Sequence, residues 1–122
     1  MLIELLRLFP PEIAHQITIK LLKSNFVYRR QNAEVFNSLK QTILGIDFQN
    51  PLGLAAGFDK NAEVIKQMLS YGFGFVEVGT ITPKPQKGNQ KPRVFRLLED
   101  KAIINHLGFN NYGSEKILKN LK

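Results

Sequence analysis

The stretch from Leu52 to Val78 constrains the fold more than any other part of the sequence. Its pattern predicts an apolar strand over Leu52–Ala56, a helix over Ala62–Tyr71 and a second apolar strand over Phe73–Val78. Two strands joined through a helix pair in parallel, with a right-handed crossover. The sequence therefore predicts an α/β fold that contains a parallel sheet.

The helix of this unit carries start and stop signals. Asn61 is a residue type that caps helix N-termini, and Gly72 suits the left-handed conformation in which helices often end. Between them, apolar residues recur at helical spacing, at Val64, Ile65, Met68 and Leu69. We therefore expect Asn61 to cap this helix.

Each predicted strand ends beside a glycine and hydrogen-bonding side chains. Gly57 precedes Asp59 and Lys60, and Gly79 precedes Thr80. Glycine lets a ligand approach the backbone, and parallel α/β folds bind ligands at the carboxyl ends of their strands. Two such ends favour a ligand site over a buried strand with an ordinary turn. Neither a Rossmann glycine motif nor a P-loop lysine motif is present.

Composition limits the classes of partner. The formal net charge of +7 favours an anionic partner such as phosphate, carboxylate, nucleic acid or a lipid surface. Cysteine is absent, and His15 and His106 show no zinc-ligand spacing, so we expect no metal site. Apolar runs fall short of the roughly 18 residues of a membrane span, and Glu4 stands where a secretory signal would be basic. We expect a cytoplasmic chain that touches a membrane.

Two leucine-rich helices, residues 2–9 and a helix from Pro11, are predicted before the α/β part. Ile13, Ile17 and Leu21 recur at four-residue spacing, flanked by Ala14 and Leu22, and predict the apolar face of the second helix. Such a pair fits either a hairpin in a membrane interface or two helices packed on the protein's own core, and the pattern alone favours the core. Basic residues gather near the end of the second helix, at Lys20, Lys23, Arg29 and Arg30.

Two hairpins and a final helix complete the expected elements. The first hairpin lies between Phe36 and Phe48 and turns at Gly45, and the second pairs Val94–Leu98 with Ala102–Ile104. The final helix is predicted from Ser114 to Leu121.

Two loops carry polar side chains. The segment Thr82–Arg93 is rich in proline and lysine but lacks the interleaved aromatics of a nucleic-acid surface, so we expect a solvated loop. The segment Asn105–Asn111 is dense in amides, which offer both donors and acceptors to a planar, carbonyl-rich ligand. Asparagines are also ordinary turn residues, so the amides alone do not decide between the two.

Long segments of the chain resemble the beginning of a class 2 dihydroorotate dehydrogenase, the quinone-dependent and membrane-associated class. The similarity runs in order through nearly the whole chain, and Pro11–His15 is similar to the extension that separates the quinone-using class from the soluble one. The matching segments are Asn50–Lys60, Glu77–Pro83, much of Pro85–Leu97, and Ile104–Asn110.

The resemblance implies the start of a (β/α)8 TIM barrel, preceded by a two-helix membrane-associating extension. Residues 1–35 would form this extension, and residues 36–122 the first part of the FMN-binding barrel. Because a TIM barrel takes about 250 residues, we expect a truncated chain with an incomplete barrel that is inactive alone. No catalytic residue is expected within the chain, since the general-base serine of the family lies beyond Lys122.

The resemblance also implies the reaction and its partners. The family uses FMN to oxidise dihydroorotate to orotate in pyrimidine biosynthesis and passes the electrons to a membrane quinone. We therefore expect a peripheral membrane protein on the cytoplasmic face of the cell membrane, or on the inner mitochondrial membrane in a eukaryote. No nucleic acid is expected as a partner.

Site residues follow from matching positions. His15 and Arg96 resemble residues at the quinone entry, and Lys60 resembles the residue that meets the substrate carboxylate. His106 stands where many relatives have arginine, which changes local charge but not the expected chemistry. The flavin-binding positions would be Ala56, Gly57, Phe58, Asp59, Lys60 and Thr80. The segment that closes over the substrate would be Asn105, His106, Leu107, Gly108 and Phe109.

Two alternatives stay open on the sequence. One is a free-standing basic module that binds lipid or nucleic acid through Lys84–Arg96 and the N-terminal helices. Such a module has no need of two glycine-ended parallel strands. The other is a soluble, fumarate- or NAD-linked relative, against which the N-terminal helical pair argues.

Overall fold

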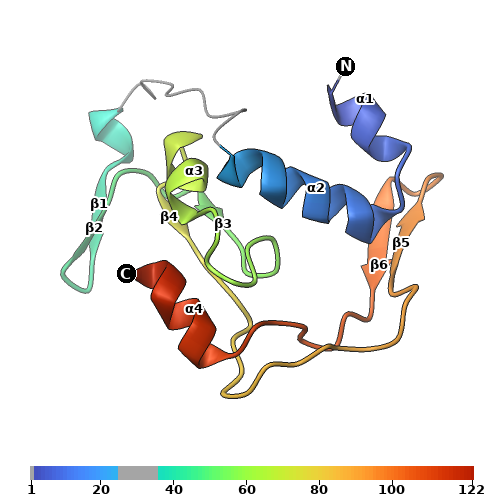
Figure 1. Ribbon diagram of the computed structural model, residues 1–122. Coiled ribbons are helices and arrows are strands. Elements are labelled where there is room, and N and C mark those ends of the chain that lie inside the picture. Colours follow the sequence, from blue (N-terminus) through green and yellow to red (C-terminus); the bar gives the residue numbers. More distant parts are fainter. Residues whose placement is uncertain (1, 25–35) are drawn as a thin grey trace.

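The computed structural model describes residues 2–24 and 36–122. The predicted domain boundary after residue 35, and the basic residues Arg29 and Arg30, lie outside the described residues. Strands of the described part form three two-stranded sheets, β1 with β2, β3 with β4, and β5 with β6 (Figure 1). The elements are α1 (Leu2–Arg7), α2 (Pro11–Lys23), a 3-10 turn (Asn37–Leu39), β1 (Gln41–Ile43), β2 (Ile46–Phe48), β3 (Gly53–Leu54), α3 (Ile65–Ser70), β4 (Phe75–Val76), β5 (Val94–Leu97), β6 (Ala102–Asn105) and α4 (Ser114–Leu121).

β3 and β4 are the parallel pair of the predicted unit, with α3 between them in sequence. Gly53 lies opposite Phe75, and a side chain at Gly53 would overlap the Phe75 ring, so this close pairing requires glycine. The α/β prediction is confirmed. Both strands are shorter than expected, because the chain turns out of the ladder after Leu54 and Gly57 adopts a φ of 110°.

α3 begins at Ile65, later than predicted, and the expected cap at Asn61 is wrong. Asp59, which is 1% exposed, instead accepts hydrogen bonds from the backbone N–H groups of Asn61, Glu63 and Val64, at 3.3, 2.9 and 2.8 Å. Ala62 adopts a φ of 56°, which is incompatible with a helix starting there. The buried carboxylate therefore organises the whole turn between β3 and α3.

A small core joins α2 to α3 and the parallel pair. Leu22 of α2 is buried with Val64 and Met68. The predicted face of α2 is confirmed at Ala14 and Leu22, which are buried, but not at Ile13, which is 45% exposed. Residues packed around the buried cluster are Ile19, Leu54, Phe58, Phe73 and Val76. α2 therefore turns the side of Ala14 and Leu22, rather than that of Ile13, toward the core.

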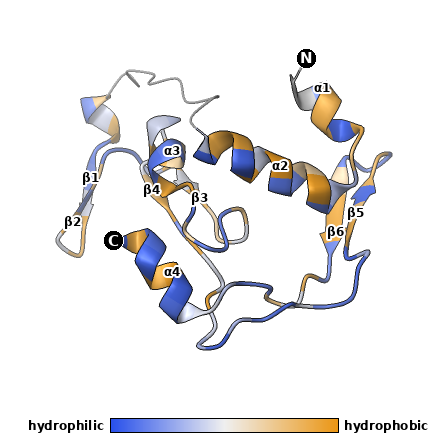
Figure 2. Ribbon diagram, in the orientation of Figure 1, coloured by the Kyte–Doolittle hydropathy of each residue, from blue (hydrophilic) through white to orange (hydrophobic). Residues whose placement is uncertain are grey.

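α1 contacts α2, and much of its ribbon is coloured as hydrophobic (Figure 2). Leu8 is 80% exposed, and Leu5 and Ile13 are also exposed. Glu4 and Arg7 pair across α1 at 3.1 Å, as their spacing predicts. Within residues 2–24 and 36–122, no helix has the length and hydropathy needed to cross a membrane.

Both hairpins and the last helix are confirmed. β1 and β2 pair in antiparallel register around Leu44 and Gly45, whose φ values of 51° and 78° are those of a tight hairpin turn. β5 and β6 are also antiparallel, and β5 contacts α2. α4 spans the predicted residues and buries Ile117 completely. The β5–β6 hairpin thereby stands next to the N-terminal helices.

Candidate functional site

The loop after β3 presents a cation beside an open stretch of backbone. Gly57 has a φ of 110°, and a Cβ there would meet no atom within 4 Å, so its face is open. The Lys60 ammonium group donates a hydrogen bond to the Gly57 carbonyl oxygen. Burial lowers the pKa of Lys60, and nearby Arg93 lowers it further, while Glu12 opposes the shift. A half-buried lysine of this kind is ready to bind an anion.

The ends of β3 and β4 face a cavity of about 540 Å³. The segment that follows β6 forms its other wall. The cavity thus brings together four predicted flavin positions, Ala56, Gly57, Lys60 and Thr80, and the predicted substrate segment Asn105, His106, Leu107, Gly108 and Phe109. Gly79 and Asn110 complete its lining.

Two predicted flavin positions, Phe58 and Asp59, do not line this cavity. The Asp59 carboxylate accepts hydrogen bonds from backbone N–H groups just before α3. Phe58 packs on the core, and its carbonyl oxygen faces His15. Any role of these two residues toward a flavin would therefore run through their backbone, and it stays a prediction.

The substrate-segment wall is braced from the Thr82–Arg93 loop. Asn89 donates from its side chain to the His106 carbonyl at 2.7 Å and from its backbone to the Leu107 carbonyl at 3.0 Å. A Cβ at Gly108 would lie only 2.8 Å from Asn89, so the two chains touch there. The loop's lysines are exposed as expected, but the expectation of a merely solvated loop missed this brace.

Asn110 lies between this cavity and a larger cleft. It lines both the cavity just described and the cleft described next. Its side-chain oxygen is buried and has no hydrogen-bond partner among the described residues. A buried, unsatisfied amide oxygen fits a ligand that can donate to it. The density of asparagines was its sequence signal, but the role prediction stopped at Phe109.

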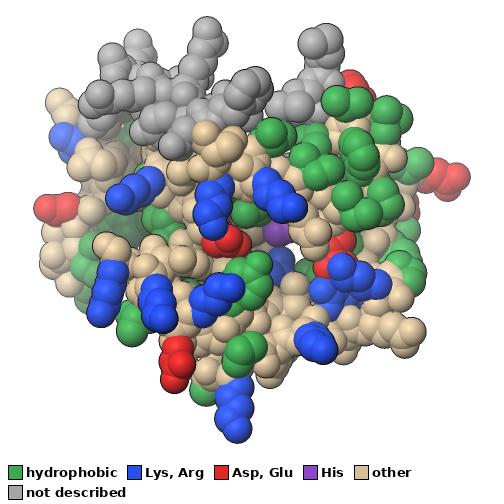
Figure 3. Space-filling view, in the orientation of Figure 1, with side chains coloured by type: hydrophobic (Ala, Val, Ile, Leu, Met, Phe, Trp, Pro, Cys, Tyr) green, Lys and Arg blue, Asp and Glu red, His purple; other side chains and the backbone are tan. Residues whose placement is uncertain are grey.

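A larger cleft of about 1120 Å³ lies between α2 and the β5–β6 hairpin side of the molecule. Figure 3 shows Lys and Arg side chains gathered around a hollow on this face. Both predicted quinone-side residues, His15 and Arg96, line the cleft, together with Lys60. Further lysines along it are Lys20, Lys23, Lys87 and Lys91. The cleft is therefore basic at its edge.

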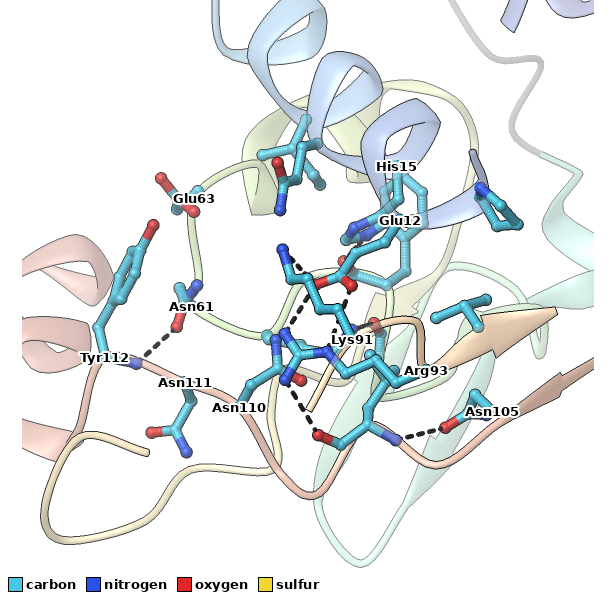
Figure 4. A pocket seen from close by; sticks show the side chains of 18 of the residues that line it. Glu12, His15, Asn61, Glu63, Lys91, Arg93, Asn105, Asn110, Asn111 and Tyr112 are labelled. Carbon is cyan, nitrogen blue, oxygen red and sulfur yellow. Dashed lines mark hydrogen bonds and ion pairs between the residues drawn. The ribbon is translucent and has the colours of Figure 1, made fainter. Parts of the chain in front are cut away.

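His15 joins α2 to the loop after β3 (Figure 4). Its Nε2 lies 2.7 Å from the Phe58 carbonyl oxygen, and its ring meets the Phe58 ring edge-on with centroids 5.4 Å apart. Burial lowers the pKa of His15, which favours the neutral imidazole. A carbonyl oxygen only accepts, so the proton sits on Nε2 and Nδ1 keeps its lone pair.

Arg96 and His106 are fixed by the hairpin. The Nη1 group of Arg96 donates to the carbonyl oxygens of Arg7 and Phe9, at 3.0 and 2.8 Å, and so holds the turn between α1 and α2 against β5. The His106 ring stacks on Phe95 with centroids 5.8 Å apart and an interplanar angle of 15°. The His106 ring is thus held against β5.

An ion pair that the sequence reasoning missed connects α2 with the same region. Arg93 is 5% exposed, and its Nε and Nη2 groups donate to the Glu12 carboxylate at 3.2 and 2.7 Å (Figure 4). The Arg93 guanidinium lowers the pKa of Glu12. The two residues stand 81 positions apart, so no local pattern could have paired them.

Comparison with known proteins decides the family. A family model described as Dihydroorotate dehydrogenase matches residues 38–122. The chain belongs to the dihydroorotate dehydrogenase family. Relatives named Dihydroorotate dehydrogenase (quinone) are similar along most of the chain. The one from Rhizobium etli is 57% identical over 114 residues, and the one from Rhizobium meliloti is 56% identical over 115 residues.

The chain spans about a third of the length of these dehydrogenase relatives. The two alignments cover 93% and 94% of this chain but 31% and 32% of the relatives. A crystal structure of DHODH in complex with ferulenol, from Eimeria tenella, matches with a TM-score of 0.85 and 49% identity, over 91% of this chain and 29% of that one. The predicted family is confirmed, and the free-standing basic module finds no support in these matches.

Within the described residues, no group of three or more His, Cys, Asp or Glu side chains could hold a metal ion.

Proposed function

We propose that this chain serves in a quinone-dependent dihydroorotate dehydrogenase, which oxidises dihydroorotate to orotate in pyrimidine biosynthesis. The observation that carries the proposal is the smaller cavity. It joins the glycine-ended strands and Lys60 to the segment Asn105–Phe109, in a chain 57% identical to a relative that bears this name. We further propose that residues 36–122 form the first part of a (β/α)8 barrel and that residues 1–35 form the N-terminal extension of the quinone-using class.

The residues around the smaller cavity fit FMN. Gly57 offers an open backbone face, Lys60 a cation, and Asn110 an unsatisfied acceptor. Ala56, Gly57, Lys60 and Thr80 would hold the flavin, with the backbone of Phe58 and Asp59 behind them. When bound, FMN would supply the redox chemistry, accepting a hydride from the substrate.

Lys60 and the substrate segment would hold the substrate. Lys60 can turn its ammonium group from the Gly57 carbonyl to the carboxylate that dihydroorotate and orotate share. Asn105 offers amide donors and acceptors that suit a planar, carbonyl-rich ring. Leu107, Gly108 and Phe109, with His106, would wall the ring off from water.

The larger cleft would receive the quinone. His15 and Arg96 line it from opposite elements, α2 and β5, and His15 is favoured in its neutral form. Leu5 and Ile13 on the neighbouring helices, and Leu8 in the turn between them, are exposed, which suits a peripheral contact with a bilayer. We propose the cytoplasmic face of the cell membrane, or the inner mitochondrial membrane in a eukaryote, as its location.

A chimera tests this function. Residues 1–122 replace the aligned part of the Rhizobium etli relative, and the purified chimera is compared with the 122-residue chain alone. We expect the chimera to hold FMN, to have its flavin reduced by dihydroorotate and to pass electrons to a short-chain quinone, while the 122-residue chain alone does none of these.

Lys60→Met in the chimera sharpens the test. We expect flavin to stay bound while the rate of its reduction by dihydroorotate falls about a hundredfold or more, because the carboxylate loses its cation. A folded chimera that binds flavin but ignores dihydroorotate refutes the proposed function.

A further inference from the structure

Arg93 connects three separate parts of the chain. Its Nε and Nη2 groups bind Glu12 on α2. Its Nη1 group donates to the carbonyl oxygens of Lys87 at 2.7 Å, Asn89 at 2.9 Å and Leu107 at 3.4 Å. The same guanidinium therefore contacts helix α2, the Thr82–Arg93 loop that braces the cavity (the bracing loop), and the wall of the smaller cavity.

The surroundings of Arg93 leave little room for adjustment. A Cβ at Gly88 would come within 2.6 Å of Arg93 Nη1, and the Arg93 carbonyl accepts a bond of 3.0 Å from His106 N–H. Arg93 thus holds the cavity wall through both its side chain and its backbone. Movement of the guanidinium would displace Leu107 directly and His106 through Asn89.

The position of this guanidinium depends on Glu12. Arg93 is nearly fully buried, and Glu12 supplies the opposite charge in a bidentate geometry, with exposed Lys91 a further 3.4 Å partner of Glu12. A buried charge whose partner is removed is strongly unfavourable, so without Glu12 the guanidinium would turn toward water. The three carbonyls would then lose their shared donor.

We propose that Arg93 is a positioning residue for the substrate segment Asn105–Phe109, anchored on α2 by Glu12. Helix α2, whose His15 faces the quinone cleft, would then also set the affinity for dihydroorotate in the other cavity. This inference rests on the proposed function.

A matched control exists in the neighbouring helix. Glu4 pairs with Arg7 at 3.1 Å, as Glu12 pairs with Arg93, but the Glu4 pair is exposed on α1 and has no contact with the substrate segment. Glu4→Gln therefore removes the same charge from a glutamate–arginine pair of the same helical region. It leaves the wall of the smaller cavity untouched.

The experiment uses the flavin-loaded chimera and follows the two half-reactions separately under anaerobic conditions. In one, dihydroorotate is titrated and flavin reduction is followed; in the other, a short-chain quinone reoxidises the reduced flavin. We expect Glu12→Gln to raise the dihydroorotate concentration for half-maximal rate about tenfold, while Glu4→Gln leaves it unchanged.

A second variant keeps the test decisive if Glu12→Gln impairs folding. Asn89→Ala loosens the same wall without touching α2, because Asn89 holds the His106 carbonyl. We expect it to raise the dihydroorotate concentration for half-maximal rate about tenfold and to leave the quinone half-reaction within about twofold of wild type.

The inference is overturned if Glu12→Gln matches Glu4→Gln in the dihydroorotate half-reaction, or if its effect is confined to the quinone half-reaction. It is also overturned if both half-reactions fall equally along with the melting temperature, which indicates general damage. Failure of the proposed function looks different, because the wild-type chimera itself then does not respond to dihydroorotate.

Discussion

The two cavities are built in different ways. The smaller one is lined by strand ends and a turn, and contacts such as that of Asn89 with His106, 17 residues apart, hold its wall. The cleft depends on side chains that reach across the chain, with separations of 43 residues for His15 and Phe58 and 87 for Arg96 and Phe9. Sequence motifs therefore predict residues that line the smaller cavity, whereas the shape of the cleft depends on how the helices pack against the rest of the chain.

Removal of the Asp59 carboxylate, in the loop between β3 and α3, should cause the largest loss of stability. Asp59→Ala leaves the buried N–H groups of Glu63 and Val64 without their acceptor, so we expect unfolding of the chimera to become easier by about 3 kcal/mol. Urea unfolding measures the change. Asp47→Ala, which removes an exposed carboxylate from β2, should change stability by less than about 1 kcal/mol. Equal effects of the two substitutions would contradict the buried-cap interpretation.

Gly88→Ala tests the packing between the bracing loop and the cavity wall. Gly88 has a φ of 74°, and a Cβ would overlap the Leu107 carbonyl and lie 2.9 Å from Asn110. We expect a loss of about 2 kcal/mol in stability together with weaker dihydroorotate binding.

Gly45→Ala is the control for backbone conformation. Gly45 has a φ of 78° but open space around it, so alanine there should cost only about 1 kcal/mol and leave dihydroorotate binding unchanged. If the two glycine variants behave alike, contact with Leu107 and Asn110 plays no part.

Acid should loosen the cleft side first. The pKa of His15 is lowered by burial, so as the pH falls below the ordinary histidine value the unfolded chain takes up a proton that the folded chain resists. Stability at the α2 contact is therefore full above that value and falls below it. Glu12, whose pKa is lowered by Arg93, adds a further loss below the ordinary glutamate value.

Unfolding of the chimera in urea at several pH values measures this dependence. His15→Gln keeps a donor for the Phe58 carbonyl but does not titrate, so its stability should vary less across the histidine range. An unchanged pH profile in this variant would assign the acid effect to other groups.

The smallest effect on stability is expected at the ion pair between α2 and the turn before α3. Lys23 and Glu63 pair at 3.0 Å, but the Lys23 side chain is 59% exposed. Lys23→Met should therefore change stability by less than about 1 kcal/mol, and the difference should shrink at high salt. A larger, salt-independent loss would mean that the cleft rests on this pair rather than on His15 and Glu12.

Local signals in the sequence predicted the helices and strands. They did not predict which residues of α2 are exposed or which residues far apart in the chain bind each other. The parallel pair, both hairpins and α4 follow from apolar patterns and turn residues such as Gly45. The predicted α2 face is confirmed at Ala14 and Leu22 but not at Ile13, since the polar contacts of Glu12 and His15 also orient this helix. The matching family segments contain residues that line the smaller cavity, and Asn110 lies in one of them, but the expected substrate segment stopped at Phe109.

Capping was misjudged for a related reason. Asn61 stands next to the predicted helix and has a favourable residue type, but a buried carboxylate two residues earlier satisfies the same amides. Burial strengthens such a charged acceptor, and only the folded chain reveals that Asp59 is buried. The Asn61 side chain is then free to accept from Tyr112 N–H at 3.0 Å.

Gly57, Lys60, Asn105, Leu107 and Asn110 line both hollows. A shared wall means that a compound seated deep in the cleft touches residues that also bound the other cavity. By thermodynamic reciprocity, if such a compound alters the affinity for a ligand across the wall, that ligand alters the compound's affinity by the same factor. The affinity of a compound that binds in the cleft and reaches Lys60 should therefore depend on whether the smaller cavity is occupied. The affinity of a compound that contacts only the helices should not.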